Sequence, residues 1–416
     1  MIHINDQKAL RVNNQLTILN VLRNQGPLSR KLLQDKTGLS WGTITHLTGE
    51  LVELEIIRET GIVSAHVGRP AVNLDLNTDD NYAVGIWMGN ARVHGTLLDL
   101  KGRQLLDRSL PLDPSADAEE IVKRIFDAVD TVMSEGSISP AHVAGIGCAV
   151  PGSYNPETGI CAYAPNHPKW RDVPLLSRIL DRYDRPTYID HDMNCCVLGE
   201  YLFGAARRLT TFVCVNVEGG IGAGIMIDGR IYRGVNNSAG ELGHIRVHPQ
   251  GPRCNCGKVG CLESVASVGA LLARARELPG VPGRDGSLAA DRGAGRYDDI
   301  DALIRTADRG DRDILSLFEE VGHYLGMGIG ILVTLFNPET VILSGSLCRA
   351  KDFLWSSMSA SLNENAWPYS RTDVRFTTLE NGIVRGAAGM VLQEVFMNAL
   401  LIRGDKHPGR ATLALE

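Results

Sequence analysis

Four potential metal ligands lie close together in the middle of the chain. One histidine and three cysteines follow one another in a glycine-rich segment: His244, Cys254, Cys256 and Cys261. Thiolates and a neutral imidazole are ligands that tetrahedral zinc prefers, and a set of three cysteines and one histidine is typical of a closed structural site. The close spacing favours this interpretation over a chance group of buried thiols around a loop histidine. We predict one structural Zn²⁺ per chain, which would also fix the neighbouring carboxylates of Glu241 and Glu263.

The composition is typical of a globular protein of two or three domains. The chain has 416 residues, of which 44% are hydrophobic and 22% charged. A net charge of −6 argues against a generally basic nucleic-acid coat. No apolar run approaches the roughly 20 residues needed to cross a bilayer, and the first residues lack the apolar segment of a signal peptide. We therefore expect a cytoplasmic protein whose other cysteines are reduced.

Residues 14–75 have the pattern of a winged helix-turn-helix domain. The predicted elements are a helix over residues 16–23, a helix capped by Ser29 and ending near Lys36, a turn over 37–40, a helix over 41–54 capped by Ser40, and two strands over 56–60 and 71–74 that flank a loop. In such domains the second helix of the motif enters the major groove. The alternative is a small helical cap with no role in DNA binding, because this pattern also arises by chance.

Exposed polar residues of this domain are candidates for DNA contacts. Side chains on the second helix could reach base edges in the major groove, and an arginine at the wing tip could enter a minor groove. The predicted DNA-binding residues are Arg30, Lys31, Ser40, Trp41, Thr43, Thr45, His46 and Arg69. Residues 1–75 hold eight Lys and Arg against seven Asp and Glu, a net charge of +1. Because phosphate binding favours more positive charge, these cations would have to cluster on one face, and dimerisation would double their effect.

The rest of the chain repeats one order of strands and helices. The predicted elements are strands over residues 82–88, 91–98 and 104–110, a helix over 118–134 and a strand over 143–150, followed by strands over 211–217, 222–227 and 229–232, a helix over 313–336 and a strand over 340–346. We predict two related α/β lobes that face a cleft. The predicted units are residues 1–76 (head), 77–200 with a return at about 385–403 (first lobe), 201–384 (second lobe) and 404–416 (flexible tail). Residues 279–296, rich in Gly, Pro and Asp, predict a mobile surface loop.

Taken together, these motifs resemble the ROK family of repressors and sugar kinases. The most specific segment is Gly-Glu-Leu-Gly-His at residues 240–244, followed by Cys-Asn-Cys-Gly-Lys-Val-Gly-Cys-Leu-Glu at residues 254–263. The resemblance extends over residues 14–403 and implies an actin-like, two-lobed α/β fold with a sugar in the cleft. The sugar-responsive repressors of the family carry an N-terminal winged helix-turn-helix, as this chain does, whereas the kinases lack it.

The resemblance also implies a set of sugar-binding residues. They are Asn166, Asp192, Glu241, His244 and Glu263. In the family the histidine binds zinc through one ring nitrogen and a sugar hydroxyl through the other. Carboxylates and an amide suit a sugar because each vicinal hydroxyl both donates and accepts a hydrogen bond.

The two phosphate-binding loops of the family's kinases are altered in this chain. At residues 87–92, Trp87 replaces an aspartate that helps to hold the metal, and the loop ends in Arg92. At residues 218–222, Glu218 places a carboxylate where phosphate oxygens would lie. A carboxylate about 4 Å from a phosphate costs on the order of 1–4 kcal/mol. Asp192 matches the catalytic base of the family's kinases. The sequence therefore keeps the residues of the sugar site, whereas the two altered loops argue against a nucleotide site.

We therefore predict a DNA-binding transcription regulator that is not an enzyme. It would act as a homodimer or homotetramer on a pseudo-palindromic operator, most simply as a repressor of sugar uptake or catabolism genes, with a sugar or sugar phosphate as effector. One alternative is an ATP-dependent sugar kinase that uses Asp192 as its base. Another is regulation by a protein partner, such as a component of sugar transport.

Overall fold

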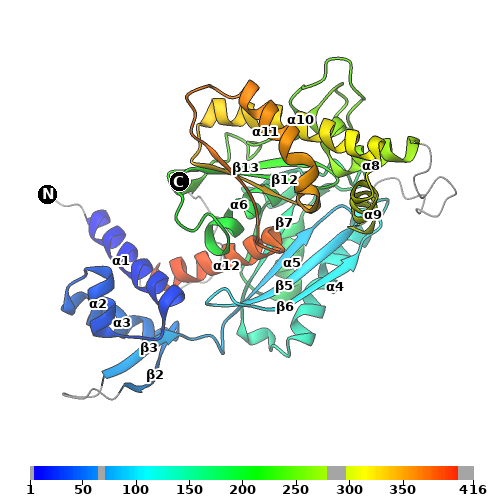
Figure 1. Ribbon diagram of the computed structural model, residues 1–416. Coiled ribbons are helices and arrows are strands. Elements are labelled where there is room, and N and C mark those ends of the chain that lie inside the picture. The colour runs from blue at the N-terminus through cyan, green and yellow to red at the C-terminus, as the bar shows by residue number, and fades with distance from the viewer. Residues whose placement is uncertain (1–3, 64–70, 279–296, 402–416) are drawn as a thin grey trace.

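The computed structural model describes residues 4–63, 71–278 and 297–401, which form a small N-terminal domain, called the head below, and two α/β lobes (Figure 1). The predicted mobile loop at residues 279–296, the predicted tail at 404–416 and the wing tip with Arg69 lie outside the described residues. Among the helices of the described residues, none combines the length and the apolar character that crossing a membrane would require.

The head is a winged helix-turn-helix (Figure 1). Its elements are α1 (Ile4–Gln25), β1 (Leu28–Ser29), α2 (Arg30–Thr37), α3 (Trp41–Glu53), β2 (Ile57–Val63) and β3 (Ala71–Leu76). As predicted, Ser29 and Ser40 cap α2 and α3, each accepting the backbone N–H of the third residue along. The predicted strands pair antiparallel as β2 and β3, and the short β1 adds a third strand on the other side of β3.

The first helix is longer than its apolar pattern indicates. Ile18 and Leu22 lie in the predicted stretch and are fully buried, whereas Leu10, one turn and more before it, is 62% exposed. The periodic pattern therefore marks only the part of α1 that meets the core. The carboxylate of Glu50 on α3 accepts hydrogen bonds from Arg11 (2.6 Å) and Gln15 (3.1 Å), which ties the earlier turns of α1 to α3.

Two five-stranded sheets share one topology and confirm the prediction of two related lobes. Lobe 1 has the strand order β11-β7-β4-β5-β6, and lobe 2 has β14-β13-β12-β15-β16. The strands of lobe 1 are β4 (Tyr82–Met88), β5 (Arg92–Asp99), β6 (Gln104–Pro111), β7 (Val143–Val150) and β11 (Thr187–His191). Those of lobe 2 are β12 (Phe212–Val217), β13 (Ile221–Ile227), β14 (Arg230–Ile231), β15 (Thr340–Ser344) and β16 (Asp373–Phe376). In each lobe three strands form an antiparallel meander and two more add in parallel.

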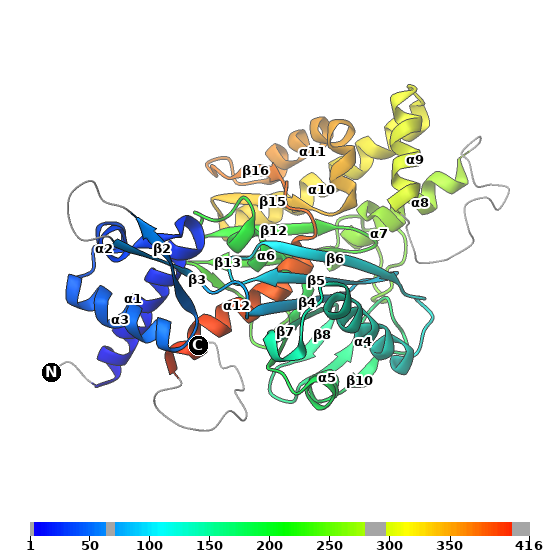
Figure 2. The same cartoon turned by 90° about the horizontal axis from the view of Figure 1, so that it is seen from below.

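Two helices lie between the lobes (Figure 2). Helix α12 (Gly382–Leu401) packs across β4 and β7 on the opposite side of the lobe 1 sheet from α4 (Ala118–Glu135), and it also packs along α6 (Asp192–Phe203). Helix α6 in turn contacts β12 and β13 of lobe 2. The C-terminal helix thus packs against the sheet of lobe 1.

Glycines allow the backbones of β7, α12 and α6 to come into direct contact. A Cβ on Gly147 of β7 would lie 1.9 Å from the carbonyl oxygen of Ala387 on α12. A Cβ on Gly386 of α12 would lie 1.8 Å from the carbonyl oxygen of Cys195 on α6. Since no side chain fits at either position, the lobe 1 sheet packs directly against α12, and α12 packs directly against α6.

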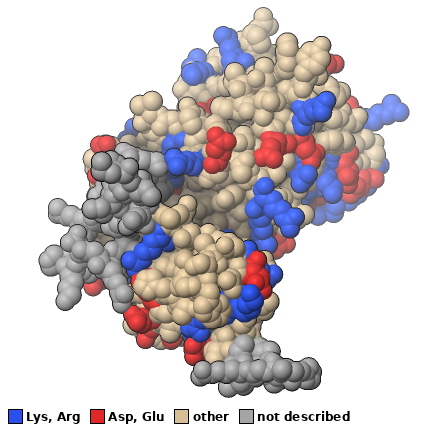
Figure 3. Space-filling view, turned by 90° about the vertical axis from the view of Figure 1, so that its left-hand side faces the viewer, with Lys and Arg blue, Asp and Glu red and all other residues tan. Residues whose placement is uncertain are grey.

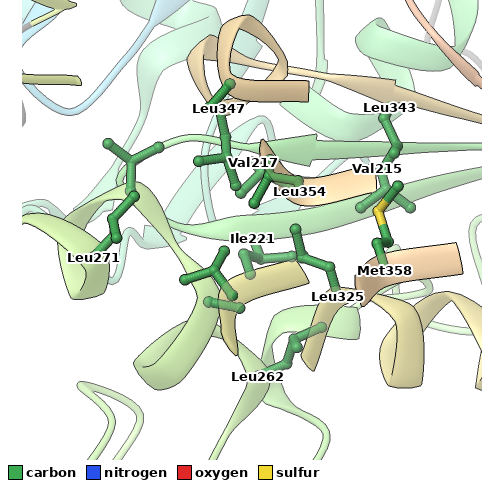
Figure 4. Packing of buried hydrophobic residues seen from close by; sticks show 14 of the residues in the cluster. Val215, Val217, Ile221, Leu262, Leu271, Leu325, Leu343, Leu347, Leu354 and Met358 are labelled. Carbon is green, nitrogen blue, oxygen red and sulfur yellow. The ribbon is translucent and has the colours of Figure 1, made fainter. Parts of the chain in front are cut away.

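Lobe 2 has the larger helical layer. Its helices are α7 (Leu262–Ala266), α8 (Val268–Glu277), α9 (Tyr297–Asp308), α10 (Arg312–Phe336) and α11 (Lys351–Asn365). Figure 4 shows Leu325 of α10 and Met358 of α11 packed toward Val215 and Ile221 of the sheet, with Leu262 of α7 below them. This core supports α7 and the loop before it, which contribute to the site described below.

The core of the head continues into lobe 1. Leu19 and Leu74 of the head belong to the same buried cluster as Leu100, Phe203 and Leu392 of the lobe, the last two from the end of α6 and the middle of α12. At the edge of this junction Lys101 and Asp75 form an ion pair of 2.6 Å between side chains that are both largely buried. A movement of α6 or α12 would therefore reach the head.

The contact between β7 and α12 makes a prediction about stability. Gly147→Ala should lower the free energy of unfolding by about 2 kcal/mol or more, because its methyl group would overlap the Ala387 carbonyl. Gly49→Ala on α3 is the matched control, since a Cβ there meets nothing within 4 Å. It should stabilise the helix by about 0.5–1 kcal/mol. Thermal melting followed by circular dichroism measures both. A Gly147→Ala protein as stable as the wild type would contradict the described packing of α12.

Candidate functional site

The four predicted metal ligands converge on one point. The nitrogen or sulfur atoms of His244, Cys254, Cys256 and Cys261 all lie within 4.8 Å of one another. His244 Nδ1 is 3.6 Å from the Sγ atom of Cys254, and the Sγ atoms of Cys256 and Cys261 are 3.7 Å apart. A tetrahedral zinc bound by sulfur at about 2.3 Å and nitrogen at about 2.0 Å separates its ligand atoms by roughly 3.5–3.8 Å. The cluster therefore has the composition and the spacing of a metal site.

Backbone hydrogen bonds shape the loop that carries the three cysteines. The N–H of Cys254 donates to Lys258 (2.8 Å), and the N–H of Gly257 donates back to Cys254 (2.9 Å). Gly260 has φ of 74°, and a Cβ there would lie 1.5 Å from the carbonyl oxygen of His248. This tight turn brings Cys261 beside Cys256 and leads directly into α7.

The cluster lies at the wall of a cleft between the lobes. The cleft has a volume of about 830 Å³ and is lined by residues of both lobes, from the turn after β4 to the start of α7. All five predicted sugar-binding residues line it: Asn166, Asp192, Glu241, His244 and Glu263. The structure thus brings together side chains that are up to 97 positions apart in the sequence (from 166 to 263).

His244 and Glu263 connect the cysteine cluster to the cleft. While His244 Nδ1 faces the thiols, its Nε2 is 3.8 Å from the carboxylate of Glu241. Glu263, on the first turn of α7, accepts the N–H of Ile221 through Oε2 (3.1 Å), and its Oε1 is 3.8 Å from Cys254 Sγ. A metal bound by the cysteines and His244 would therefore hold two of the cleft's polar groups in place.

Asp192 is the first residue of α6. His191 caps this helix, since its Nδ1 accepts the N–H of Met193 (3.3 Å), and its Nε2 is 3.6 Å from Asp192 Oδ1. Burial raises the pKa of the Asp192 carboxyl, and the nearby His191 offsets part of this effect. The N-terminus of α6 also favours a negative charge at this position.

Two polar side chains near the cleft, Asn90 and Asp190, were not among the site residues predicted from the sequence. Asn90 accepts a hydrogen bond from Asn166 (3.1 Å), so the altered first loop helps to orient Asn166, one of the predicted sugar-binding residues. Asp190, at the end of β11, accepts hydrogen bonds from Arg233 (2.6 Å) and Asn237 (3.3 Å) of lobe 2. The only sequence signal for this link between the lobes is a second acid two residues before Asp192.

In the second altered loop, the carboxylate of Glu218 is hydrogen-bonded within the protein. Both oxygens of Glu218 accept hydrogen bonds from Ser346, one from the N–H and one from the hydroxyl, each at 2.6 Å. Burial raises the pKa of the Glu218 carboxyl, and the two Ser346 donors lower it in part. A bound carboxylate thus occupies donors that could otherwise bind a phosphate.

In the first altered loop, the ring of Trp87 stacks on His94 at 5.1 Å. Burial lowers the pKa of His94 to about 4, so the imidazole is neutral at pH 7. Both rings line the cleft, and they give this end of it an aromatic, uncharged wall.

Five of the eight predicted DNA-binding residues belong to α3 or to its N-cap. Trp41 and His46 on α3 are 51% and 67% exposed, and Ser40 and Thr45 are also exposed while Thr43 is half-buried. Ser40 and Thr43 bond to each other at the start of α3, and Lys31 pairs with Asp35. Arg30 is engaged inside the head, where it donates to Thr48 (3.0 Å) and lies 3.5 Å from Glu59. In Figure 3 the head faces the viewer, and its few visible charges are of both signs.

Fold and site together define a two-lobed protein with a DNA-binding head, and comparison with known proteins agrees. The model of the ROK family matches residues 83–394, and a model described as winged helix-turn-helix DNA-binding matches residues 13–58. The chain belongs to the ROK family, and it is a DNA-binding transcription regulator of that family.

Three of the similar proteins are named as repressors or regulators, and each of them aligns with this chain over nearly its whole length. The xylose repressor of Bacillus subtilis (strain 168) is 31% identical over 399 residues, which are 96% of this chain and 98% of the repressor. The DNA-binding transcriptional dual regulator NagC of Escherichia coli (strain K12) is 27% identical, with 94% of each chain covered. A crystal structure of a ROK family transcriptional regulator, a homologue of the E. coli MLC protein, aligns with a TM-score of 0.77 at 27% identity and covers 95% of this chain and 99% of its own.

The neutral His94 predicts a pH dependence of stability. Because folding lowers its pKa from 6.5 to about 4, the unfolded chain binds a proton between these pH values that the folded chain does not. The contribution of His94 to the free energy of unfolding is complete above pH 6.5. It falls by about 3 kcal/mol in total as the pH approaches 4. Thermal melting of wild type and His94→Gln should show a smaller acid loss in the variant. His323→Gln, at an exposed histidine of α10, should keep the wild-type loss. Equal acid profiles for all three proteins would contradict the assignment.

Proposed function

We propose that this protein represses genes of sugar uptake or catabolism in the cytoplasm and leaves its operator when a sugar or sugar phosphate binds between the lobes. The observation that carries the proposal is that five polar side chains meet in one cleft beside the cysteine cluster. The names of the similar proteins, a xylose repressor and NagC, support the same function.

In this proposal Asn166, Asp192 and Glu241 bind sugar hydroxyls from the two sides of the cleft, together with His244 and Glu263. Carboxylates accept hydrogen bonds from the sugar hydroxyls, and the amide both donates and accepts them. Because the residues come from both lobes, a sugar that bonds to all of them favours a closed cleft.

A structural Zn²⁺ on His244 and the three cysteines supports the site. The donor set and the distances of 3.6 and 3.7 Å fit this ion. Zinc would supply rigidity, since it would prevent the loop from moving away when a ligand bonds to His244 Nε2 or to Glu263.

DNA binding is proposed for the exposed side of α3, with Ser40, Trp41, Thr43, Thr45 and His46 at the major groove and Lys31 near the backbone. Arg69 at the wing tip remains a candidate for the minor groove, and Arg30 would act by positioning α3 through Thr48. A homodimer or homotetramer would present two heads to a pseudo-palindromic operator. Since α6 runs from the cleft to the head junction, closure of the cleft would change the spacing of the heads, with a coupling of about 1–3 kcal/mol.

The proposal is tested with DNA that the purified protein selects from a random pool. Thr45→Ala should weaken binding of the selected DNA about fivefold or more, because it removes a contact in the groove. Thr158→Ala, at an exposed threonine of lobe 1, should bind like the wild type. Addition of a sugar from a panel that includes D-xylose and N-acetyl-D-glucosamine should release the wild-type complex. Failure to select any DNA, or a complex that no carbohydrate releases, would refute the proposal.

Removal of a metal ligand should uncouple the two sites. Cys256→Ser is expected to lose bound zinc, measured by mass spectrometry of the native protein, and to lose sugar-dependent release while DNA binding remains. Cys348→Ser changes a half-buried cysteine outside the cluster and should retain both properties. A Cys256→Ser protein with full zinc and normal release would show that the metal assignment is wrong.

A further inference from the structure

The charges that line the cleft restrict the ligands it can bind. Among the lining residues are five carboxylates and two arginines: Asp113, Asp192, Glu218, Glu241, Glu263, Arg92 and Arg124. Three of the carboxylates, Asp192, Glu241 and Glu263, belong to the proposed sugar site. Burial is the main cause of the raised pKa of Asp192, and the negative charge of Glu241 adds a smaller repulsion. An anionic ligand would add to this repulsion.

The two arginines form other contacts. Arg92 donates through Nε to the hydroxyl of Ser109 (2.6 Å) on the neighbouring strand β6. Arg124, on α4, lies 3.4 Å from the carboxylate of Asp127 one turn further along. Among the described residues, neither guanidinium is paired with a carboxylate of the proposed sugar site, where the nearest basic side chains are His191 and His244.

Two backbone N–H groups near the cleft already donate to carboxylates. The N–H of Ile221 donates to Glu263, and the N–H and hydroxyl of Ser346 donate to Glu218. Such donors at the ends of strands and helices are the groups that bind phosphate oxygens in other proteins. Here internal anions occupy them.

Trp87 closes the end of the site beside Asp192. Its ring is held by the stack on the neutral His94, and its approach lowers the pKa of the Asp192 carboxyl in part. The indole N–H is buried and lies near the Asp192 carboxyl, although it does not reach full hydrogen-bond geometry with any of the described residues. One neutral donor suits a hydroxyl oxygen of a sugar, but it cannot balance the two charges of a phosphate ester.

We propose that the effector is an uncharged sugar, and that Trp87 and Glu218 make the cleft reject the corresponding sugar phosphate. This inference rests on the proposed function, and it narrows that function to one chemical class of effector. Trp87 acts by filling the space beside Asp192 where a phosphoryl group would lie. Glu218 acts by its charge and by its hold on Ser346.

The inference is tested by calorimetric titration of the full chain with three pairs of probes: D-xylose and D-xylose 5-phosphate, D-glucose and D-glucose 6-phosphate, and N-acetyl-D-glucosamine and its 6-phosphate. The neutral sugar that binds best should bind about tenfold or more tightly than its phosphate ester. Trp87→Ala and Glu218→Gln should each reduce this ratio, because one opens space and the other removes charge. Trp87→Phe keeps an aromatic ring at the position and is expected to keep most of the discrimination.

The outcomes separate the two proposals. A phosphate ester that binds as tightly as its parent sugar, or more tightly, would overturn the inference and leave the repressor function standing. Full discrimination in both Trp87→Ala and Glu218→Gln would show that these residues do not cause it. If no probe of either kind bound to protein that still binds its selected DNA, the proposed sugar response itself would fail, and the inference with it.

Discussion

Backbone contact between α12, α6 and the lobe 1 sheet is the constraint on which the rest of the structure depends. Gly147 and Gly386 allow these elements to touch without intervening side chains, so they shift together or not at all. Helix α6 begins at the cleft with Asp192 and ends in the core that the head shares with lobe 1. One rigid stack therefore joins the candidate ligand site to the DNA-binding domain, a geometry that suits a regulator.

The cleft concentrates carboxylates at a cost that specific partners offset. Asp190 is held by Arg233, Glu218 by Ser346 and Asp192 by its place at the start of α6. Buried carboxylates without such partners would be strongly destabilising. Since Arg233 belongs to lobe 2 and Asp190 to lobe 1, the same interaction also keeps the lobes close. The electrostatics of the site and the closure of the cleft are thus parts of one arrangement.

Local signals in the sequence predicted much of the fold. Ser29 and Ser40 marked the starts of α2 and α3 because a cap depends only on residues within one turn. The strand from Val143 to Val150 was predicted with its observed bounds, since a short, wholly apolar run is typical of a buried strand. The early turns of α1 and the short strand β1 were missed. Their partners, Glu50 and β3, lie far along the chain, and no local pattern reports them.

For the candidate site, the sequence by itself determined the chemistry: which side chains can bind a metal, that His244 is followed by three cysteines, and that Trp87 and Glu218 replace the residues of a nucleotide site. Such properties belong to residue types and short spacings. Only the tertiary structure decided how these groups meet. It paired Asn90 with Asn166, joined the lobes through Asp190 and Arg233, and paired Glu218 with Ser346. These contacts join residues that are 43 to 128 positions apart in the sequence. Only the packing of whole sheets and helices brings such residues together.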